Sequence, residues 1–185
     1  MKQFLLAMVC ICSTSLFAQT KFSPVDKSAM DMAYYPDMYP VLKIQDKATE
    51  PLVARAIYSR PQKNGRVIFG ELVEYGKVWR LGANEATEIE FYKNVTIKNT
   101  KVKKGRYTLY CIPYEDKWTL IINKDTDSWG AFKYNQAKDV VRIDVPVKKQ
   151  SDIVEAFSMT FEKTPTGSNL QIAWDDVRAT MPISF

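Results

Sequence analysis

Side chains that could recognise a ligand are concentrated in one segment, residues 59–91, which reads SRPQKNGRVIFGELVEYGKVWRLGANEATEIEF. The segment also contains four of the chain's seven glycines, so its backbone could double back and bring these side chains together. Arginine forks bind carboxylates and phosphates bidentately, so guanidinium groups beside an indole could cradle a sugar acid, a carboxylate or a phosphate. The candidate ligand-binding residues are Arg60, Lys63, Arg66, Trp79, Arg80, Asn84, Glu85 and Glu88.

The same side chains could instead hold the segment together. Arg80 could pair with Glu85 or Glu88, and Asn84 could bond to exposed backbone, which would tie down a long loop that lacks a regular ladder. Unpaired buried charges are costly, so some internal pairing is expected in either case. The sequence leaves the ligand site and the structural network as two open interpretations.

Most familiar enzyme classes are excluded by composition. The chain has no histidine, so it can form neither a Ser-His-Asp triad nor a histidine-ligated zinc site. It also lacks the GxxxxGK and GxGxxG phosphate-binding patterns. Asp125 and Asp127 resemble part of a calcium loop, but Trp129 and Gln136 occupy positions that need ligands, which favours an acidic turn. We therefore predict no cofactor, no metal site and no assignable catalytic residue.

The first 18 residues have the build of a secretory signal peptide. A single charge at Lys2 precedes an apolar run over residues 4–11, and Ala18 provides a small residue before Gln19. The run is too short for a stable membrane span, so no transmembrane segment is expected once it is removed. Location in the periplasm or outside the cell follows, and loss of residues 1–18 leaves Cys111 without a disulfide partner, as a small buried residue.

The formal net charge of +5 does not point to nucleic acid as a partner. The lysines occur singly or in pairs along the sequence and form no stripe. Nucleic acid is also an improbable partner for an exported protein, so mild basicity is most simply explained by solubility.

The elements that must position these side chains are predicted to be strands. From residue 52 onward, short runs alternate apolar and polar residues and are separated by turn residues, whereas no apolar set recurs at helical spacing. This pattern predicts an all-β fold, a single antiparallel β-sandwich or barrel-like domain over residues 51–185. The expected strands are 52–59, 87–91, 95–97, 107–112, 118–123, 140–147, 155–162, 170–175 and 177–183.

Two hairpins can be predicted in register. The short turn YEDK places Tyr107, Leu109 and Cys111 on one face with Trp118, Leu120 and Ile122. A second hairpin places Phe157, Met159 and Phe161 opposite Leu170, Ile172 and Trp174. These rows predict core, so we expect Trp118 and Trp174 to be packed inside.

Residues 19–50 follow neither period. They carry three methionines, three tyrosines and prolines at 24, 36 and 40, which rule out a long helix. We predict an extended Pro/Tyr/Met-rich arm that lies over the domain, with Tyr34, Tyr35 and Tyr39 covering apolar surface. An arm that binds a protein partner is the alternative.

The strings SRPQKNGRVIFG (59–70) and VWRLGANEAT (78–87) resemble the hallmark of the DUF2911 family, proteins of unknown function common in the Bacteroidetes. Departures are Glu74, where proline is usual, and Leu81, where threonine is usual; no charged motif residue is lost. The resemblance covers most of residues 30–180. It implies a single exported β-rich domain, and it supplies no activity.

The resulting expectation is an exported small-ligand-binding β-sandwich, with a polar or anionic ligand such as a glycan at residues 60–88. The first alternative is a structural or interaction module of the cell envelope without enzymatic activity. The second is a carboxylate-dependent glycoside hydrolase using Glu85 and Glu88, which would need their carboxylates about 5 to 9 Å apart across a cleft. An enzyme is the less favoured class, because nothing in the sequence fixes that separation.

Overall fold

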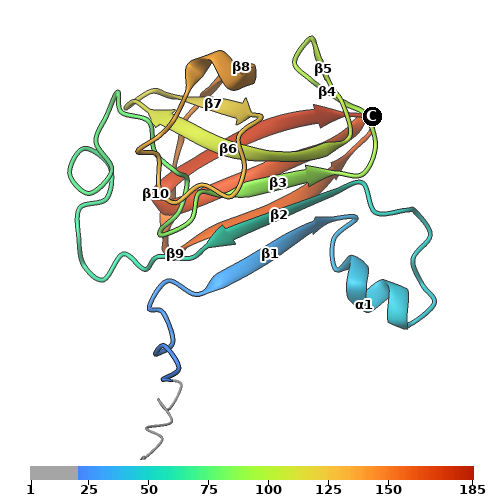
Figure 1. Ribbon diagram of the computed structural model, residues 1–185, viewed down its shortest axis with the longest axis horizontal. Helices are drawn as coiled ribbons and strands as arrows, with labels where there is room; N and C mark the ends of the chain where they lie inside the picture. Colours follow the sequence, from blue (N-terminus) through green and yellow to red (C-terminus); the bar gives the residue numbers. More distant parts are fainter. Residues whose placement is uncertain (1–20) are drawn as a thin grey trace, which may run out of the picture.

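The chain folds as two antiparallel sheets. A computed structural model describes residues 21–185, so the predicted signal peptide lies outside the described residues. The first sheet has six strands in the order β1-β2-β3-β6-β7-β8 (Figure 1). Their bounds are β1 Met30–Tyr35, β2 Ala54–Ser59, β3 Glu88–Phe91, β6 Gly105–Pro113, β7 Lys117–Asn123 and β8 Asp139–Pro146.

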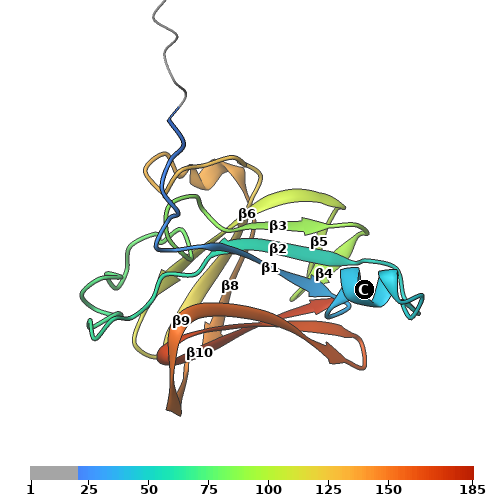
Figure 2. The same ribbon diagram turned by 90° about the horizontal axis from the view of Figure 1, so that it is seen from below.

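The second sheet has four strands in the order β5-β4-β10-β9. Their bounds are β4 Val95–Ile97, β5 Thr100–Val102, β9 Lys148–Thr164 and β10 Gly167–Ser184. Seen from below, β9 and β10 form one layer and β1, β2, β3 and β6 the layer facing it (Figure 2). The sheets do not close into a barrel, so the sandwich form of the predicted all-β fold is confirmed.

One core fills the space between the sheets. Strand β3 shows how the period-two pattern builds it, because Ile89 and Phe91 are buried while Glu88 and Glu90 face outward. Trp118 from β7 and Trp174 from β10 are both fully buried in the same cluster. Cys111 is buried there too, and its burial raises the pKa of the thiol well above its usual value, which makes it an inert packing residue.

Both predicted hairpins are confirmed. Leu109 pairs with Ile122 and Cys111 with Leu120 across β6 and β7. Across β9 and β10, Phe161 pairs with Leu170. The prediction of separate strands at 170–175 and 177–183 is wrong, because both belong to the single strand β10. The alternation of apolar and polar residues is interrupted at this point of the sequence. The β9–β10 ladder shifts register there, and Asp175 has a φ of 57°.

The prediction of an extended arm over residues 19–50 needs correction. Residues 30–35 form β1, which pairs with β2 from Met30 opposite Ser59 to Tyr35 opposite Ala54. A short helix α1, Tyr39–Ile44, follows with Pro40 in its first turn, where proline is tolerated. Tyr35 is buried against Phe161 and Phe185, so this part of the arm is an integral edge of the sandwich.

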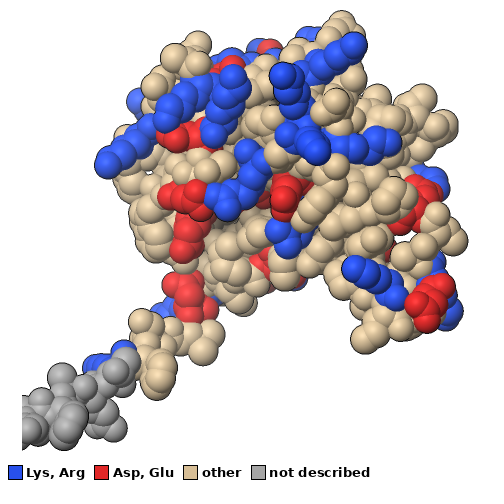
Figure 3. All heavy atoms as spheres, turned by 45° about the vertical axis from the view of Figure 1, so that its right-hand side comes forward, with Lys and Arg blue, Asp and Glu red and all other residues tan. Residues whose placement is uncertain are grey.

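The sequence did not reveal β5, a three-residue strand at the edge of the second sheet. Lys101 on this strand and the neighbouring Lys98, Lys103 and Lys104 are exposed. On the face drawn in Figure 3, Lys and Arg gather toward the top, where Figure 1 places β8 and the β4–β5 hairpin. Lysines on an edge strand hinder pairing with another chain. A short 3-10 helix, Gln136–Lys138, precedes β8, and no helix within residues 21–185 is long and apolar enough to cross a membrane.

Candidate functional site

Residues 79–87 form a loop that is fastened to β6 at both of its ends, by Trp79 and by the Thr87 carbonyl. Trp79 and Cys111 of β6 exchange two backbone hydrogen bonds of 2.7 and 3.0 Å. At the other end of the loop, the Thr87 N–H donates to the Arg80 carbonyl at 3.0 Å, and the Thr87 hydroxyl donates to the Leu81 carbonyl. Leu81 and Thr87 are fully buried. The loop therefore holds Arg80 on a backbone that is fixed on both sides.

Glycine is required at one point of this loop. Gly82 has a φ of 152°, and a Cβ there would lie 3.2 Å from the Ser59 carbonyl oxygen. The hydroxyl of Ser59 also donates to the Ala83 carbonyl at 2.6 Å. The loop backbone thus packs directly on the end of β2, and a side chain at position 82 would crowd this contact.

Trp79 is a core residue. Its ring stacks on Trp174 with centroids 6.0 Å apart and meets Phe157 edge-on at 5.3 Å. Its indole N–H donates to the Gly82 carbonyl at 3.1 Å. Only the edge of a side chain that is 7% exposed can reach a ligand, so Trp79 contributes a wall and no stacking platform.

Arg60 is committed to contacts within the fold. Its guanidinium pairs with Asp31 of β1 at 2.9 Å and donates to the Ser158 hydroxyl at 2.9 Å and the Phe157 carbonyl at 3.2 Å. Since these partners lie on β1 and β9, Arg60 links an edge strand of one sheet to an edge strand of the other.

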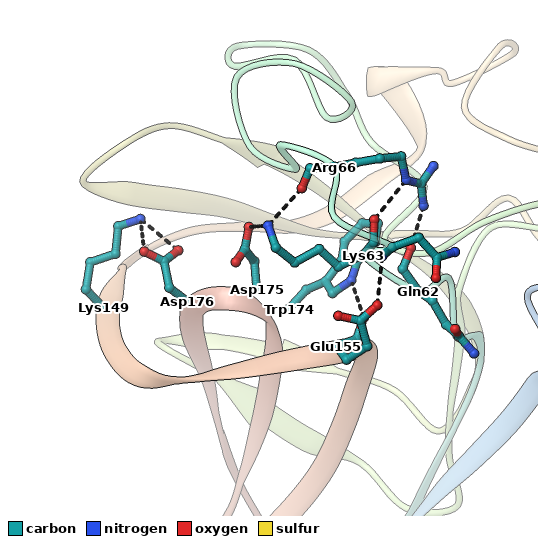
Figure 4. A network of polar contacts seen from close by, with 9 residues as sticks. Gln62, Lys63, Arg66, Lys149, Glu155, Trp174, Asp175 and Asp176 are labelled. Carbon is teal, nitrogen blue, oxygen red and sulfur yellow. Dashed lines mark hydrogen bonds and ion pairs between the residues drawn. The ribbon is translucent and has the colours of Figure 1, made fainter.

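Lys63 and Arg66 close a bend over the β9–β10 hairpin (Figure 4). The Lys63 ammonium pairs with Asp175 at 2.6 Å and donates to the Arg66 carbonyl at 2.8 Å. The guanidinium of Arg66 bonds back to the carbonyls of Lys63 and Gln62. The ion-pair partner of Lys63 thus lies outside the segment, on β10, and Arg66 remains exposed to solvent.

Asn84 and Glu85 act through their backbone. The carbonyl of Asn84 accepts from the Gly130 N–H at 2.9 Å, and Glu85 pairs with Trp129 in an isolated bridge. Asn84 has a φ of 56°, a conformation that asparagine tolerates better than most residues. These contacts attach the loop over residues 128–134 to the loop that carries Arg80.

The expected pairing of Arg80 with Glu85 or Glu88 is absent from the described residues. Glu88 instead pairs with Arg106 at 3.1 Å and accepts from the Asp127 N–H at 2.7 Å. Glu85 and Glu88 line a separate hollow of about 210 Å³ on the outer side of the six-stranded sheet, together with Met30 and Ile57. The eight candidate residues therefore do not converge on one site.

Arg80 stands apart from the other charged residues of the segment. Within residues 21–185 it forms no ion pair, and its Nε is buried without a hydrogen-bond partner. Burial lowers the pKa of its guanidinium. Arg80 also lines two adjacent hollows, of about 250 and 170 Å³, which share Leu72, Val73 and Trp79 as walls.

The two hollows differ in their charged residues. The first is lined by Glu74 and Lys77 besides Arg80, and the second by Arg66. The sequence did not single out Leu72 or Phe132, which also line the first hollow. Phe132 lies two residues after Gly130, in a stretch with no strand period. Its position beside Arg80 depends on the pairing of this loop with residues 84–86, which are distant in the sequence.

The acidic turn shows no sign of a cation site. Asp125 pairs with Lys138 at 2.8 Å, and Asp127 pairs with Arg106. An Asx-type bond stabilises this turn, since the side chain of Asn123 accepts from the Asp125 N–H at 2.8 Å. No group of three or more His, Cys, Asp or Glu side chains placed to hold a metal occurs in the part of the chain that the structure describes.

A family model described as a protein of unknown function, DUF2911, matches residues 43–183, more than half of the chain. The chain belongs to the DUF2911 family. No curated protein and no solved structure matches it.

The DUF2911 hallmark segment divides into two parts in this structure. The first part, residues 59–70, uses Arg60 and Lys63 to bind the β9–β10 hairpin and β1. The second part, residues 78–87, packs Trp79 into the core and leaves Arg80 between two hollows. The first part of the segment is therefore committed to contacts within the fold, whereas Arg80 in the second part is not.

Proposed function

We propose that this DUF2911 protein is an exported binding protein that takes up a small anionic ligand at Arg80. The observation that carries the proposal is a partly buried guanidinium with no carboxylate partner among residues 21–185. The buried Nε of this guanidinium has lost its hydration without gaining a hydrogen bond within residues 21–185, so a bound anion would supply the missing interaction. Export rests on the signal peptide predicted for residues 1–18.

The surroundings of Arg80 favour an anion over a cation. The second hollow carries Arg66 and Arg80 and has no acidic lining residue. The first carries Lys77 and Arg80 against the single carboxylate of Glu74. Because the Arg80 loop is fixed by backbone bonds to Cys111 and Leu109 of β6, little ordering would be needed when a ligand binds.

The hydrolase alternative receives support from one observation, the shared hollow of Glu85 and Glu88. Glu88, however, is bound to Arg106 at 3.1 Å and to the Asp127 N–H at 2.7 Å. Glu85 is exposed, and the alternative would use these two carboxylates as the acid and the base. Turnover of an oligosaccharide panel that is lost in Glu85→Gln would establish this alternative.

A thermal-shift screen of residues 19–185 tests the proposed function. Short carboxylic acids, sugar acids, glycans, nucleotides and inorganic phosphate would be the probes. A ligand at a hundred times its Kd adds about 2.7 kcal/mol to the free energy of unfolding, which raises Tm by roughly 5 to 10 °C in a domain of this size. We expect at least one anion to do so in the wild-type protein.

Two variants make the screen specific. Arg80→Gln is expected to abolish the shift, and Arg80→Lys to weaken it, because lysine keeps the charge and loses the fork. Arg178→Gln is the matched control, since Arg178 is an exposed β10 residue that forms no ion pair in the described part of the chain. A shift that survives in Arg80→Gln, or a screen without any shift, would overturn the proposal.

A further inference from the structure

Exposed apolar side chains occur on the two loops that meet at the first Arg80 hollow. Phe132 is 86% exposed and Trp129 62% exposed, and both lie in the loop over residues 128–134. Val67 and Leu72, from the loop over residues 66–76, are about half exposed. Leu72 and Phe132 both line the first hollow, so the two loops meet there. Single exposed apolar residues are ordinary, but two at the rim of one charged hollow, on loops that carry two more, suggest contact with a ligand or a partner.

The exposure of Phe132 is built into the structure. Gly130 has a φ of 67°, and a Cβ at this position would lie 2.7 Å from the Phe132 ring, so the ring rests directly over the glycine. The Gly130 N–H donates to the Asn84 carbonyl and the Ala86 N–H donates to the Ser128 carbonyl. These two backbone hydrogen bonds attach the loop over residues 128–134 to the Arg80 loop, and they hold the Phe132 ring beside it.

The underside of the same loop is anchored in a small second core. Ala131 and Tyr134 pack against Tyr110 of β6 and Ile121 of β7, on the outer face of the six-stranded sheet. The rings of Tyr110 and Tyr134 are 5.3 Å apart and meet edge to face. Since the small residue Ala131 and Tyr134 supply the packing on either side, Phe132 remains outside and adds nothing to that core.

The charges that line the first hollow suit a ligand with one negative charge. Lys77 and Arg80 are opposed by Glu74, which leaves one positive charge in excess. A doubly charged phosphate would meet repulsion from Glu74 that a single carboxylate, placed at Arg80, would largely avoid. The rest of the lining is apolar, with Leu72 and Phe132 at the exposed rim.

We propose that the ligand is a carboxylate carried on an apolar or aromatic body, with the carboxylate on Arg80 and the body against Leu72 and Phe132. The inference rests on the proposed function and names the substrate class of that site. Burial of an apolar body against exposed Leu and Phe side chains contributes affinity that a sugar acid or a simple anion would not obtain.

A ligand series of constant charge tests this inference. Acetate, hexanoate, 3-phenylpropionate and the neutral 3-phenylpropionamide would be titrated into residues 19–185 by calorimetry or by NMR. We expect the Kd to fall at least tenfold from acetate to 3-phenylpropionate, and the amide to lose most of that affinity. Glucuronate and inorganic phosphate complete the series as anions without an apolar body.

Variants separate the two contributions. Phe132→Ala is expected to weaken 3-phenylpropionate several-fold and to leave acetate unchanged, whereas Arg80→Gln is expected to weaken every acid. Phe22→Ala is the matched control, because Phe22 is 87% exposed, close to the 86% of Phe132, and lines no hollow with Arg80. Tm of each variant without ligand shows that the fold is intact, as expected for substitution of exposed rings.

The possible outcomes distinguish failure of the inference from failure of the function. Equal binding of all carboxylates with no effect of Phe132→Ala, or binding of glucuronate or phosphate alone, would overturn the apolar body and leave an anion site at Arg80. Absence of binding by every anion, or binding that is unchanged in Arg80→Gln, would overturn both.

Discussion

Lys63 illustrates how the fold uses a charged motif residue. Its side chain and that of Asp175 are 21% and 15% exposed, so the pair is largely removed from water. We predict that Lys63→Met lowers the free energy of unfolding by about 1 to 3 kcal/mol, because Asp175 keeps its charge and loses its partner. Denaturant unfolding followed by tryptophan fluorescence measures the change.

A neighbouring ion pair provides the control. Lys149 pairs with Asp176 at 2.8 Å on the same hairpin, but these side chains are 66% and 37% exposed (Figure 4). Lys149→Met should therefore cost no more than about 1 kcal/mol. Equal losses in both variants would show that burial does not set the strength of the Lys63 pair.

The charged side chains that make specific contacts could be singled out from the sequence, whereas the residues that they bind could not. Arg60 bonds to Ser158 and Lys63 to Asp175, about a hundred positions away. The direction of Asp175 also depends on an irregularity inside β10. From nearby residues alone, Glu85 and Glu88 were expected to pair with Arg80. In the structure, Glu88 forms its ion pair with Arg106.

At the scale of elements, the strand β1 is the largest departure from expectation. Its sequence, MDMAYY, has little β-branched content and follows prolines and charges, so its weak pattern becomes a strand only by pairing with β2. The regular strands from residue 52 onward were predictable because one face of each is buried in a single core. The three-residue β5 carries too few residues to show a period.

Two adjacent tyrosines test the role of β1. Tyr35 is 3% exposed between Phe161 and Phe185, whereas Tyr34 faces the outer side of the sheet. We predict that Tyr35→Ala lowers the free energy of unfolding by about 3 kcal/mol, the usual cost of removing a buried ring. Tyr34→Ala should stay below about 1 kcal/mol. Similar small losses in chemical denaturation would mean that β1 is a detachable arm.

The Arg80 loop provides a second element-scale prediction. Gly82→Ala would place a Cβ against the Ser59 carbonyl at a φ that L-residues rarely adopt, so we expect a loss of about 1 to 3 kcal/mol. Gly65→Ala is the control, because Gly65 also has a positive φ and has open space around it. A thermal unfolding comparison in which Gly65→Ala is the more damaging variant would contradict this account of the loop.

At the scale of the whole molecule, tyrosines with a raised pKa make the free energy of unfolding depend on pH in the alkaline range. Burial is the largest cause that raises the pKa of six phenols above their ordinary value, and for Tyr92 and Tyr134 the pKa reaches about 12. Tyr92 also donates to Glu90 at 2.7 Å and Tyr134 to Asp139 at 2.6 Å, which further favours the protonated phenols. The other four are Tyr35, Tyr58, Tyr107 and Tyr110.

A phenol with a higher pKa in the folded state binds its proton more tightly there than in the unfolded chain. Its contribution to stability is complete below the unfolded pKa of about 10 and is lost as pH rises through the folded value. We therefore predict that Tm falls steeply between about pH 10 and 12 and that phenolate absorbance appears together with unfolding. Tyr134→Phe should flatten part of this fall, because phenylalanine has no proton to lose. If all the phenols titrate near pH 10 while the tryptophan signal of the folded core persists, the fold does not hold these phenols in the protonated form and the prediction is wrong.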